Sequence, residues 1–162
     1  MSWAAVAVLG YVTLERLLEL VFAGRNTKRL LAKGAREHGA GHYPLIVAVH
    51  ALWLATLWFL AIDRVPDPFW LAMYVLLQAA RIWVLATLGP RWTTRIIVLP
   101  GEDLVKEGPY RFLNHPNYWV VIGEIAVLPL VFALPWVALA FTVLTAAALA
   151  VRLREENRAL GR

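Results

Sequence analysis

Five apolar stretches dominate this sequence of 162 residues and restrict what it can fold into. They cover approximately residues 3–23, 45–62, 69–88, 119–133 and 136–151. A helix needs about 20 residues to cross the hydrocarbon core of a bilayer, and the first three stretches are long enough. With 60% hydrophobic residues and eight tryptophans, the chain is also too apolar for a water-exposed surface. We therefore predict an all-α integral membrane protein with about five transmembrane helices, in a single domain over residues 1–162.

The last two stretches are short and lie almost end to end. Only Leu134 and Pro135 separate them, and Pro129 interrupts the first of the two. A proline inside a helix removes a backbone hydrogen bond and bends or ends the helix. The pair therefore forms either two tilted spans or a helical hairpin that does not fully cross the membrane.

Charged and polar side chains interrupt the first and third stretches. Glu15, Arg16 and Glu19 lie in the first, and Gln78 and Arg81 lie in the third. Such groups are costly in hydrocarbon, so we expect them to face the helix bundle, pair with one another and serve packing or topology. We interpret the first stretch as a retained helix rather than a signal peptide, because no basic region precedes it and charges interrupt it.

Thirteen of the sixteen basic residues fall in three segments that border the apolar stretches. These are Arg25, Lys28, Arg29, Lys33 and Arg36, then Arg91, Arg95, Lys106 and Arg111, then Arg152, Arg154, Arg158 and Arg162. The loop at residues 63–68 carries two acids and one base. The positive-inside rule then places the N-terminus outside and the three basic segments, with the C-terminus, in the cytoplasm. The net charge of +5 is thus an orientation signal, and we expect no nucleic-acid partner.

The longest polar connection, residues 89–118, is the best candidate for a functional site. Turn residues such as Gly108-Pro109 favour an ordered loop. Within it, Tyr110, Arg111, Asn114 and His115 offer a ring, a permanent cation, an amide and an imidazole, which suit a polar ligand carrying a carboxylate and a base. The alternative is a juxtamembrane loop whose tyrosines and arginine contact lipid headgroups. Cysteine is absent, so disulfides, cysteine zinc sites and thiol nucleophiles are excluded.

Two motifs in this loop carry a family resemblance. The runs Gly108-Pro109-Tyr110-Arg111 and Asn114-His115-Pro116-Asn117-Tyr118, followed by Glu124 and by the segment 152–160, resemble the isoprenylcysteine carboxyl methyltransferase family and the related phospholipid methyltransferases. The resemblance covers about the last half of the chain, including residues 89–93. It implies a membrane methyltransferase whose cofactor, S-adenosylmethionine, is held by the loop at residues 89–118 and the C-terminal helix.

The resemblance also implies roles for individual residues. The cofactor-binding residues would be Gly108, Pro109, Tyr110, Arg111, His115, Pro116, Tyr118 and Glu156. Candidate catalytic residues are Arg152, then Arg111 or Glu124, and candidate substrate contacts are His42, His50 and Trp92. An acceptor that is already ionised needs an arginine to orient it, whereas a hydroxyl needs a base such as His115, Glu124 or His42. Neither a metal nor a covalent intermediate is required. Because His50 lies two helical turns beyond His42, we expect the two side chains to share a helix face and point at the same cavity.

The implied reaction is O-methylation of a carboxylate or an acidic hydroxyl on a lipophilic small molecule, either isoprenylcysteine-like or long-chain and polyketide-like. Its apolar part would enter from the bilayer, with membrane lipids as neighbours. An alternative acceptor is a phospholipid amine. Two other classes remain open: a nicotinamide-dependent membrane reductase acting on a sterol-like double bond, and a small membrane scaffold.

Overall fold

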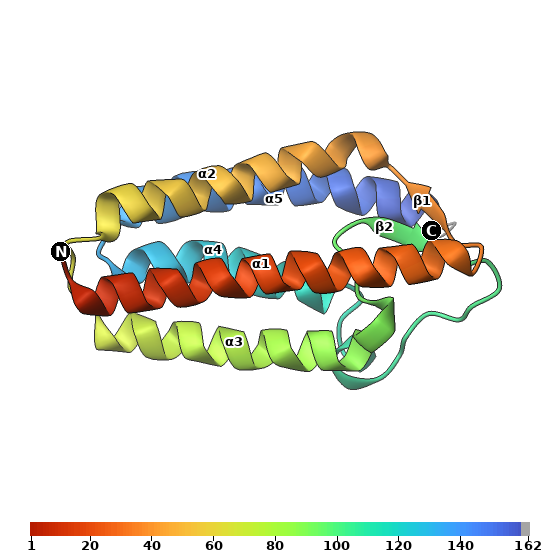
Figure 1. Cartoon of the computed structure of the whole chain (residues 1–162), viewed down its shortest axis with the longest axis horizontal. Coiled ribbons are helices and arrows are strands. Elements are labelled where there is room, and N and C mark those ends of the chain that lie inside the picture. Colours follow the sequence, from red (N-terminus) through yellow and green to blue (C-terminus); the bar gives the residue numbers. More distant parts are fainter. Residues whose placement is uncertain (160–162) are drawn as a thin grey trace.

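The computed structural model describes residues 1–159 and consists mainly of five helices that run alongside one another (Figure 1). They are α1 (Trp3–Ala32), α2 (Tyr43–Ala61), α3 (Pro68–Leu88), α4 (Pro116–Val131) and α5 (Pro135–Ala159). Short 3-10 helices cover Ala40–His42, Gly89–Arg91 and Gly108–Arg111. The predicted all-α fold is confirmed. Leu160 and Arg162, which belong to the terminal segment discussed above, lie outside the described residues.

Three segments are long and apolar enough to cross a membrane, namely Ala40–Ala61, Pro68–Arg91 and Pro135–Ala159. Helices α1 and α4 are not among these three segments. Helix α1 has 30 residues and extends well past the predicted end at residue 23, because the polar segment after Ala23 also forms helix. Helix α4 has only 16 residues, about 24 Å at 1.5 Å per residue.

The turns at one end of the bundle are fixed by local hydrogen bonds. Asp67 caps α3, because its Oδ1 accepts from the backbone N–H groups of Phe69 at 2.9 Å and Trp70 at 3.1 Å. The backbone N–H of Asp67 also donates to the carbonyl of Val131 at 2.7 Å, at the C-terminus of α4. The short turn between α4 and α5 therefore lies beside the α2–α3 turn, and α4 and α5 form a helical hairpin that reaches this end (Figure 1).

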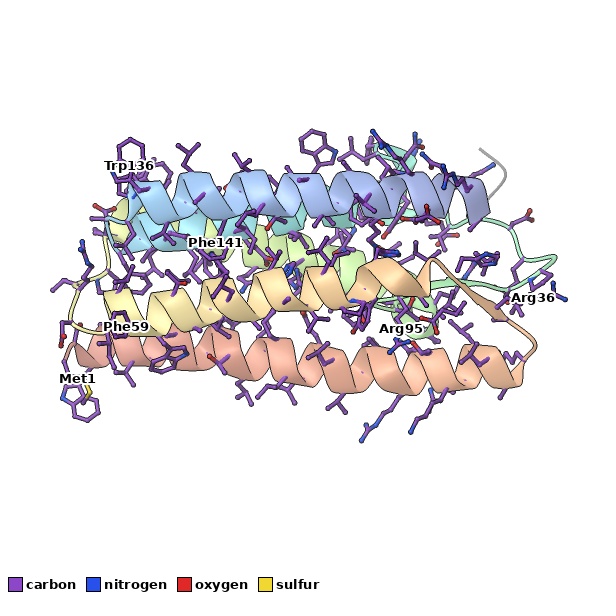
Figure 2. All side chains as sticks on the ribbon, turned by 90° about the horizontal axis from the view of Figure 1, so that it is seen from above. Met1, Arg36, Phe59, Arg95, Trp136 and Phe141 are labelled. Carbon is purple, nitrogen blue, oxygen red and sulfur yellow. The ribbon has the colours of Figure 1, made fainter. Side chains whose placement is uncertain are left out.

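The opposite end of the bundle holds the basic segments and a small sheet. Figure 2 shows Arg36 and Arg95 at this end, away from Met1, Phe59 and Trp136. Strands β1 (Arg36–His38) and β2 (Ile96–Val98) pair antiparallel, with Arg36 opposite Val98 and His38 opposite Ile96. Sequence reasoning missed these strands, because three residues are too few for an alternating pattern.

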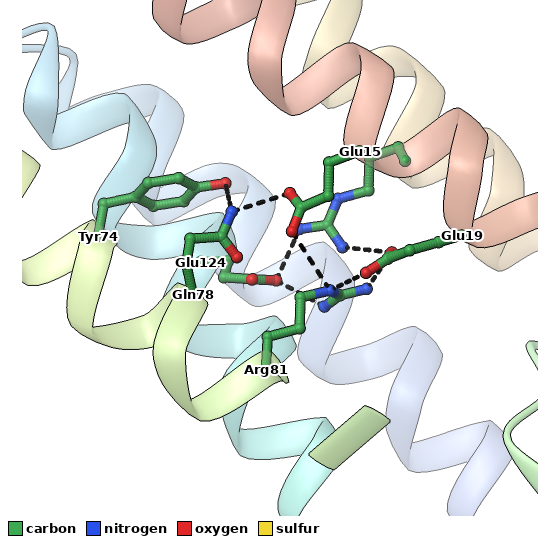
Figure 3. Close-up of polar contacts among 7 residues, drawn as sticks. Glu15, Glu19, Tyr74, Gln78, Arg81 and Glu124 are labelled. Atoms are coloured by element: carbon green, nitrogen blue, oxygen red, sulfur yellow. Dashed lines mark hydrogen bonds and ion pairs between the residues drawn. The ribbon is translucent and has the colours of Figure 1, made fainter. Parts of the chain in front are cut away.

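Buried ion pairs join α1, α3 and α4 inside the bundle (Figure 3). Arg81 donates from Nη1 to Glu124 Oε2 at 2.8 Å and binds both carboxylate oxygens of Glu19. Arg16 donates to Glu124 Oε2 at 2.7 Å and to Glu19 Oε2 at 3.1 Å. Gln78 donates to Glu15 at 2.8 Å. The prediction that these polar groups pair with one another inside the bundle is therefore confirmed.

Candidate functional site

A polar cavity of about 570 Å³ lies at the end of the bundle that carries the sheet. Its wall comes from the C-terminus of α3, strand β2, the loop before α4, the first turn of α4 and the C-terminal part of α5. The side chains are Leu88, Arg91, Trp92, Thr93, Arg95, Ile96, Ile97, Val98, Leu104, Val105, Lys106, Tyr110, Arg111, Asn114, His115, Asn117, Tyr118, Arg152 and Glu156. This size is typical of a small-molecule site. The loop predicted from sequence therefore does border a cavity.

A hydrogen-bonded network links the loop to the C-terminal helix across this cavity. Arg152 Nε donates to the hydroxyl oxygen of Tyr118 at 2.9 Å, and the Tyr118 hydroxyl donates to Glu156 Oε2. The rings of Tyr118 and His115 stack with centroids 5.3 Å apart. His115 Nδ1 lies 3.8 Å from Glu156 Oε1. The network therefore holds an imidazole, a carboxylate and a guanidinium group at one wall.

Tyr110 and Gly108 give the loop its local shape. Burial and the nearby Glu156 carboxylate raise the pKa of Tyr110, so its phenol stays protonated and able to donate. Gly108 adopts a positive φ of 54°, and a Cβ at this position would fall on Thr87 Oγ1. Gly108 and the buried Pro109 therefore position the loop against α3.

A second, mostly apolar cavity of about 280 Å³ lies deeper in the bundle. Its wall consists of Thr13, Arg16, Leu17, Glu19, Leu20, Tyr43, Ile46, Val47, His50, Ala51, Trp53, Leu54, Arg81, Trp92, Thr93, Thr94, Asn117, Tyr118, Val121, Leu149 and Arg152. On α2, residues 43, 46, 47, 50, 51 and 54 follow helical spacing and form one face. Leu17, Leu20 and Val47 are partly exposed, so this cavity has an edge on the outer surface of the bundle.

The two cavities share one wall. Five residues line both of them: Trp92, Thr93, Asn117, Tyr118 and Arg152. Two polar atoms in this wall, Trp92 Nε1 and Asn117 Oδ1, are buried without a hydrogen-bond partner among the described residues. A polar and an apolar compartment thus meet at Arg152, beside polar atoms that are free to bind a ligand or an ordered water molecule.

The structure separates His42 from His50. His50 lines the apolar cavity, whereas His42 lines neither of the two cavities and lies against Gly39 and Glu155. The expectation that they share a helix face is wrong, because His42 ends the 3-10 helix Ala40–His42 and only His50 belongs to α2. Tyr43, at a spacing of seven, takes the position above His50.

The remaining predicted residues divide into three groups. Tyr110, Arg111, His115, Tyr118, Glu156, Arg152 and Trp92 line the polar cavity. Gly108, Pro109 and Pro116 shape the loop without lining either cavity. Glu124 is 1% exposed and lies in the buried ion-pair cluster, bonded to Arg16 and Arg81. Among residues 1–159, no group of His, Asp and Glu side chains is placed to hold a metal ion.

Comparison with known proteins decides the family. The family model for isoprenylcysteine carboxyl methyltransferases matches residues 70–162, which contain α4, α5 and most of the polar cavity. The chain belongs to the isoprenylcysteine carboxyl methyltransferase family. It is therefore a membrane methyltransferase.

Two uncharacterized bacterial proteins are similar to most or all of the chain. The uncharacterized protein YpbQ of Bacillus subtilis is 38% identical over 99% of this chain and 96% of its own length. An uncharacterized protein of Haemophilus influenzae is 26% identical over 90% of this chain and 88% of its own length. No solved structure matches the chain.

Sequence reasoning missed several residues that shape the site of this methyltransferase. Asn26, in the unpredicted extension of α1, donates to the carbonyls of Trp92 at 2.9 Å and Gly89 at 3.1 Å. Thr94 bonds through its Oγ1 to Tyr43 at 3.1 Å, and its carbonyl accepts from Arg152. In the sequence, Asn26, Thr94 and Tyr43 are only an amide and two hydroxyl groups beside apolar stretches. Such residues are too common to be recognised as parts of a site.

Proposed function

We propose that the protein transfers a methyl group from S-adenosylmethionine to an oxygen atom of a lipid-like acceptor. The observation that carries this proposal is the shared wall at Trp92, Thr93, Asn117, Tyr118 and Arg152, where a polar and an apolar cavity meet. A reaction between a polar cofactor and a lipophilic acceptor requires such a junction, because each reactant needs its own compartment and the reacting atoms must come together.

The polar cavity fits the chemical groups of the cofactor. The cavity offers His115 and Arg111 as donors to its carboxylate and Glu156 as a partner for its ammonium group. The apolar side chains of residues 96–98, with Leu104 and Val105, form a wall suited to an adenine ring. When bound, the cofactor supplies an electrophilic methyl group on a sulfonium centre.

The apolar cavity suits the acceptor. Leu17 and Leu20 on α1 face Val47 on α2, and all three are partly exposed where the bilayer would contact the bundle. An acceptor with an apolar chain would enter from the membrane between these helices and carry its polar end toward Arg152. Trp92 lines both cavities at the shared wall, and in this proposal it contacts the acceptor.

Arg152 acts on the acceptor at the junction. Its Nε is bound to Tyr118 and its Nη1 to the Thr94 carbonyl, so two contacts fix the guanidinium plane in the shared wall. A fixed guanidinium group orients an acceptor oxygen and stabilises negative charge on it. The protein therefore contributes alignment and exclusion of water, which are the main requirements of a methyl transfer.

The same proposal includes the orientation in the membrane. Arg95 lies at the end of the bundle that carries the sheet (Figure 2), and it lines the polar cavity together with Arg91, Lys106, Arg111 and Arg152. The positive-inside rule then assigns this end, and the cofactor site, to the cytoplasm and assigns the N-terminus to the outside.

The test is transfer of radiolabelled methyl from S-adenosylmethionine into a membrane lipid extract by the detergent-purified protein. We expect label in the organic phase that depends on the protein. After acid hydrolysis of the extracted lipid, which frees any N-methylated ethanolamine, the labelled product should not bind a cation exchanger. Label retained by the exchanger would indicate a phospholipid amine as acceptor and contradict transfer to oxygen. Absence of protein-dependent label in the organic phase would contradict lipid methylation altogether.

A further inference from the structure

Methyl transfer to a neutral hydroxyl releases a proton inside an apolar cavity, and some group must accept it. We propose that His50 is this base, and that the acceptor is consequently a weakly acidic hydroxyl rather than a carboxylate. This inference rests on the proposed function, because it concerns the acceptor side of the same reaction.

The imidazole of His50 is oriented by its own helix. His50 Nδ1 lies 2.8 Å from the carbonyl oxygen of Ile46. Because a carbonyl oxygen only accepts, Nδ1 carries the hydrogen, and in the neutral ring Nε2 holds the free lone pair. No hydrogen bond to Nε2 is present among residues 1–159. His50 therefore presents a basic nitrogen from the wall of the apolar cavity.

The other basic groups in this wall are already engaged. Glu19 binds Arg81 through both oxygens and Arg16 through one of them. The Tyr43 hydroxyl is bonded to Thr94 at 3.1 Å. An oxygen that already accepts from a guanidinium group is a poor proton acceptor, because its negative charge is stabilised. His50 is the remaining candidate in this wall with a free nitrogen lone pair.

The bases expected from the sequence lie elsewhere. His115 lines the polar cavity only, Glu124 is buried between two arginines, and His42 lines neither cavity. A base must come within hydrogen-bond reach of the proton that it removes. Since the acceptor occupies the apolar cavity, geometry favours His50 over all three.

Charged groups on several helices surround His50. The groups that line the same cavity are Arg16 and Glu19 on α1, Arg81 on α3, Tyr118 on α4 and Arg152 on α5. Arg16, Arg81 and Arg152 are near enough for their charges to act on the His50 imidazole. Guanidinium groups stay protonated and cannot remove the acceptor's proton. They stabilise the acceptor oxygen as it loses its proton to His50.

The step balances without any further reactant. The O–H bond of the acceptor breaks and its proton passes to His50 Nε2, while the oxygen forms a bond to the methyl carbon. The bond between that carbon and the sulfonium sulfur breaks, and its electron pair stays on sulfur. The products are a methyl ether, the demethylated cofactor and a protonated His50, which later releases its proton to water.

The test compares two acceptor probes of similar chain length, a dodecyl-substituted phenol and dodecanoic acid, with radiolabelled cofactor. We expect the intact protein to methylate the phenol, with activity that falls at low pH as the base becomes protonated. His50→Gln keeps a donor for the Ile46 carbonyl but supplies no base. We expect it to lower kcat for the phenol by about 10²- to 10⁴-fold and to abolish the low-pH limb.

His38→Gln is the matched control, because His38 lies in β1 and lines neither cavity. Cofactor binding by calorimetry shows whether each variant is folded and separates the two proposals. Three results would overturn the role of His50: an unchanged rate and pH profile in His50→Gln, methylation of dodecanoic acid in preference to the phenol, or methylation of neither probe by a protein that binds the cofactor. Failure of the intact protein to bind the cofactor would instead overturn the proposed function.

Discussion

Arg152 Nε on α5 donates a hydrogen bond of 2.9 Å to the hydroxyl oxygen of Tyr118 on α4, and both residues line the polar and the apolar cavity. This bond fixes a cation at the place where the two compartments meet. In the proposed reaction, the residues on either side of this bond serve different reactants.

Replacing Arg152 should remove catalysis and largely spare cofactor binding. We expect Arg152→Ala to lower methyl transfer by about 10²- to 10³-fold, the effect typical of losing one donor to a developing oxyanion. Arg152→Lys should recover only part of this, because an ammonium group cannot keep both contacts. Initial rates of label transfer provide the measurement, and Arg154→Ala, on the exposed side of α5, is the control. Full activity in Arg152→Ala would exclude this role.

Glu156 and Glu155 offer a matched pair for the cofactor site. Glu156 lines the polar cavity, whereas Glu155 is bonded to the exposed Arg158 at 2.9 Å and does not line it. We expect Glu156→Gln to weaken binding of S-adenosylmethionine by about 10- to 100-fold, because a charge-assisted contact contributes about 1.5–3 kcal/mol. Glu155→Gln should bind normally in the same calorimetric titration. Equal affinities for both variants would remove Glu156 from the site.

The helices and the loop were predictable, because hydropathy and turn residues are local signals. Sequence reasoning placed the loop at residues 89–118, and Tyr110, His115 and Tyr118 do line one cavity. His42 and His50 were not separable from the sequence, because spacing alone does not show that α2 begins only at Tyr43, after the 3-10 helix that contains His42. Residues that act through tertiary contacts, such as Asn26, carry no distinctive local pattern.

Arg81 and Glu19 form a buried ion pair, and substitutions at the two positions should have coupled effects on the free energy of unfolding. Arg81 is 5% exposed, and its loss would leave two carboxylates, those of Glu19 and Glu124, sharing the single cation of Arg16. We expect Arg81→Met to reduce the free energy of unfolding by about 3–5 kcal/mol. Adding Glu19→Met should restore part of that loss, since one uncompensated charge is then removed. Unfolding in detergent micelles, followed by circular dichroism, provides the measurement. A double variant less stable than Arg81→Met alone would contradict this coupling.

Gly108 should be required for the shape of the loop. At its φ of 54°, a Cβ is both strained and placed on Thr87 Oγ1. Gly101 also has a positive φ, of 82°, but open space around it, so Gly101→Ala isolates the backbone strain. We expect Gly108→Ala to lower cofactor affinity more than Gly101→Ala does, and Thr87→Ala to relieve part of the defect. Equal affinities of the two alanine variants would show that contact with Thr87 is unimportant.

Whether the polar cavity binds S-adenosylmethionine is tested most simply by calorimetry. The cofactor and its demethylated product are titrated into the detergent-purified protein and into His115→Ala. His115 lines the polar cavity and stacks on Tyr118, so the variant removes one wall of the proposed cofactor site. We expect both compounds to bind the intact protein with micromolar affinity and to lose this binding in His115→Ala. Binding of a nicotinamide cofactor in place of S-adenosylmethionine would contradict the proposed S-adenosylmethionine-dependent methyl transfer and support a reductase.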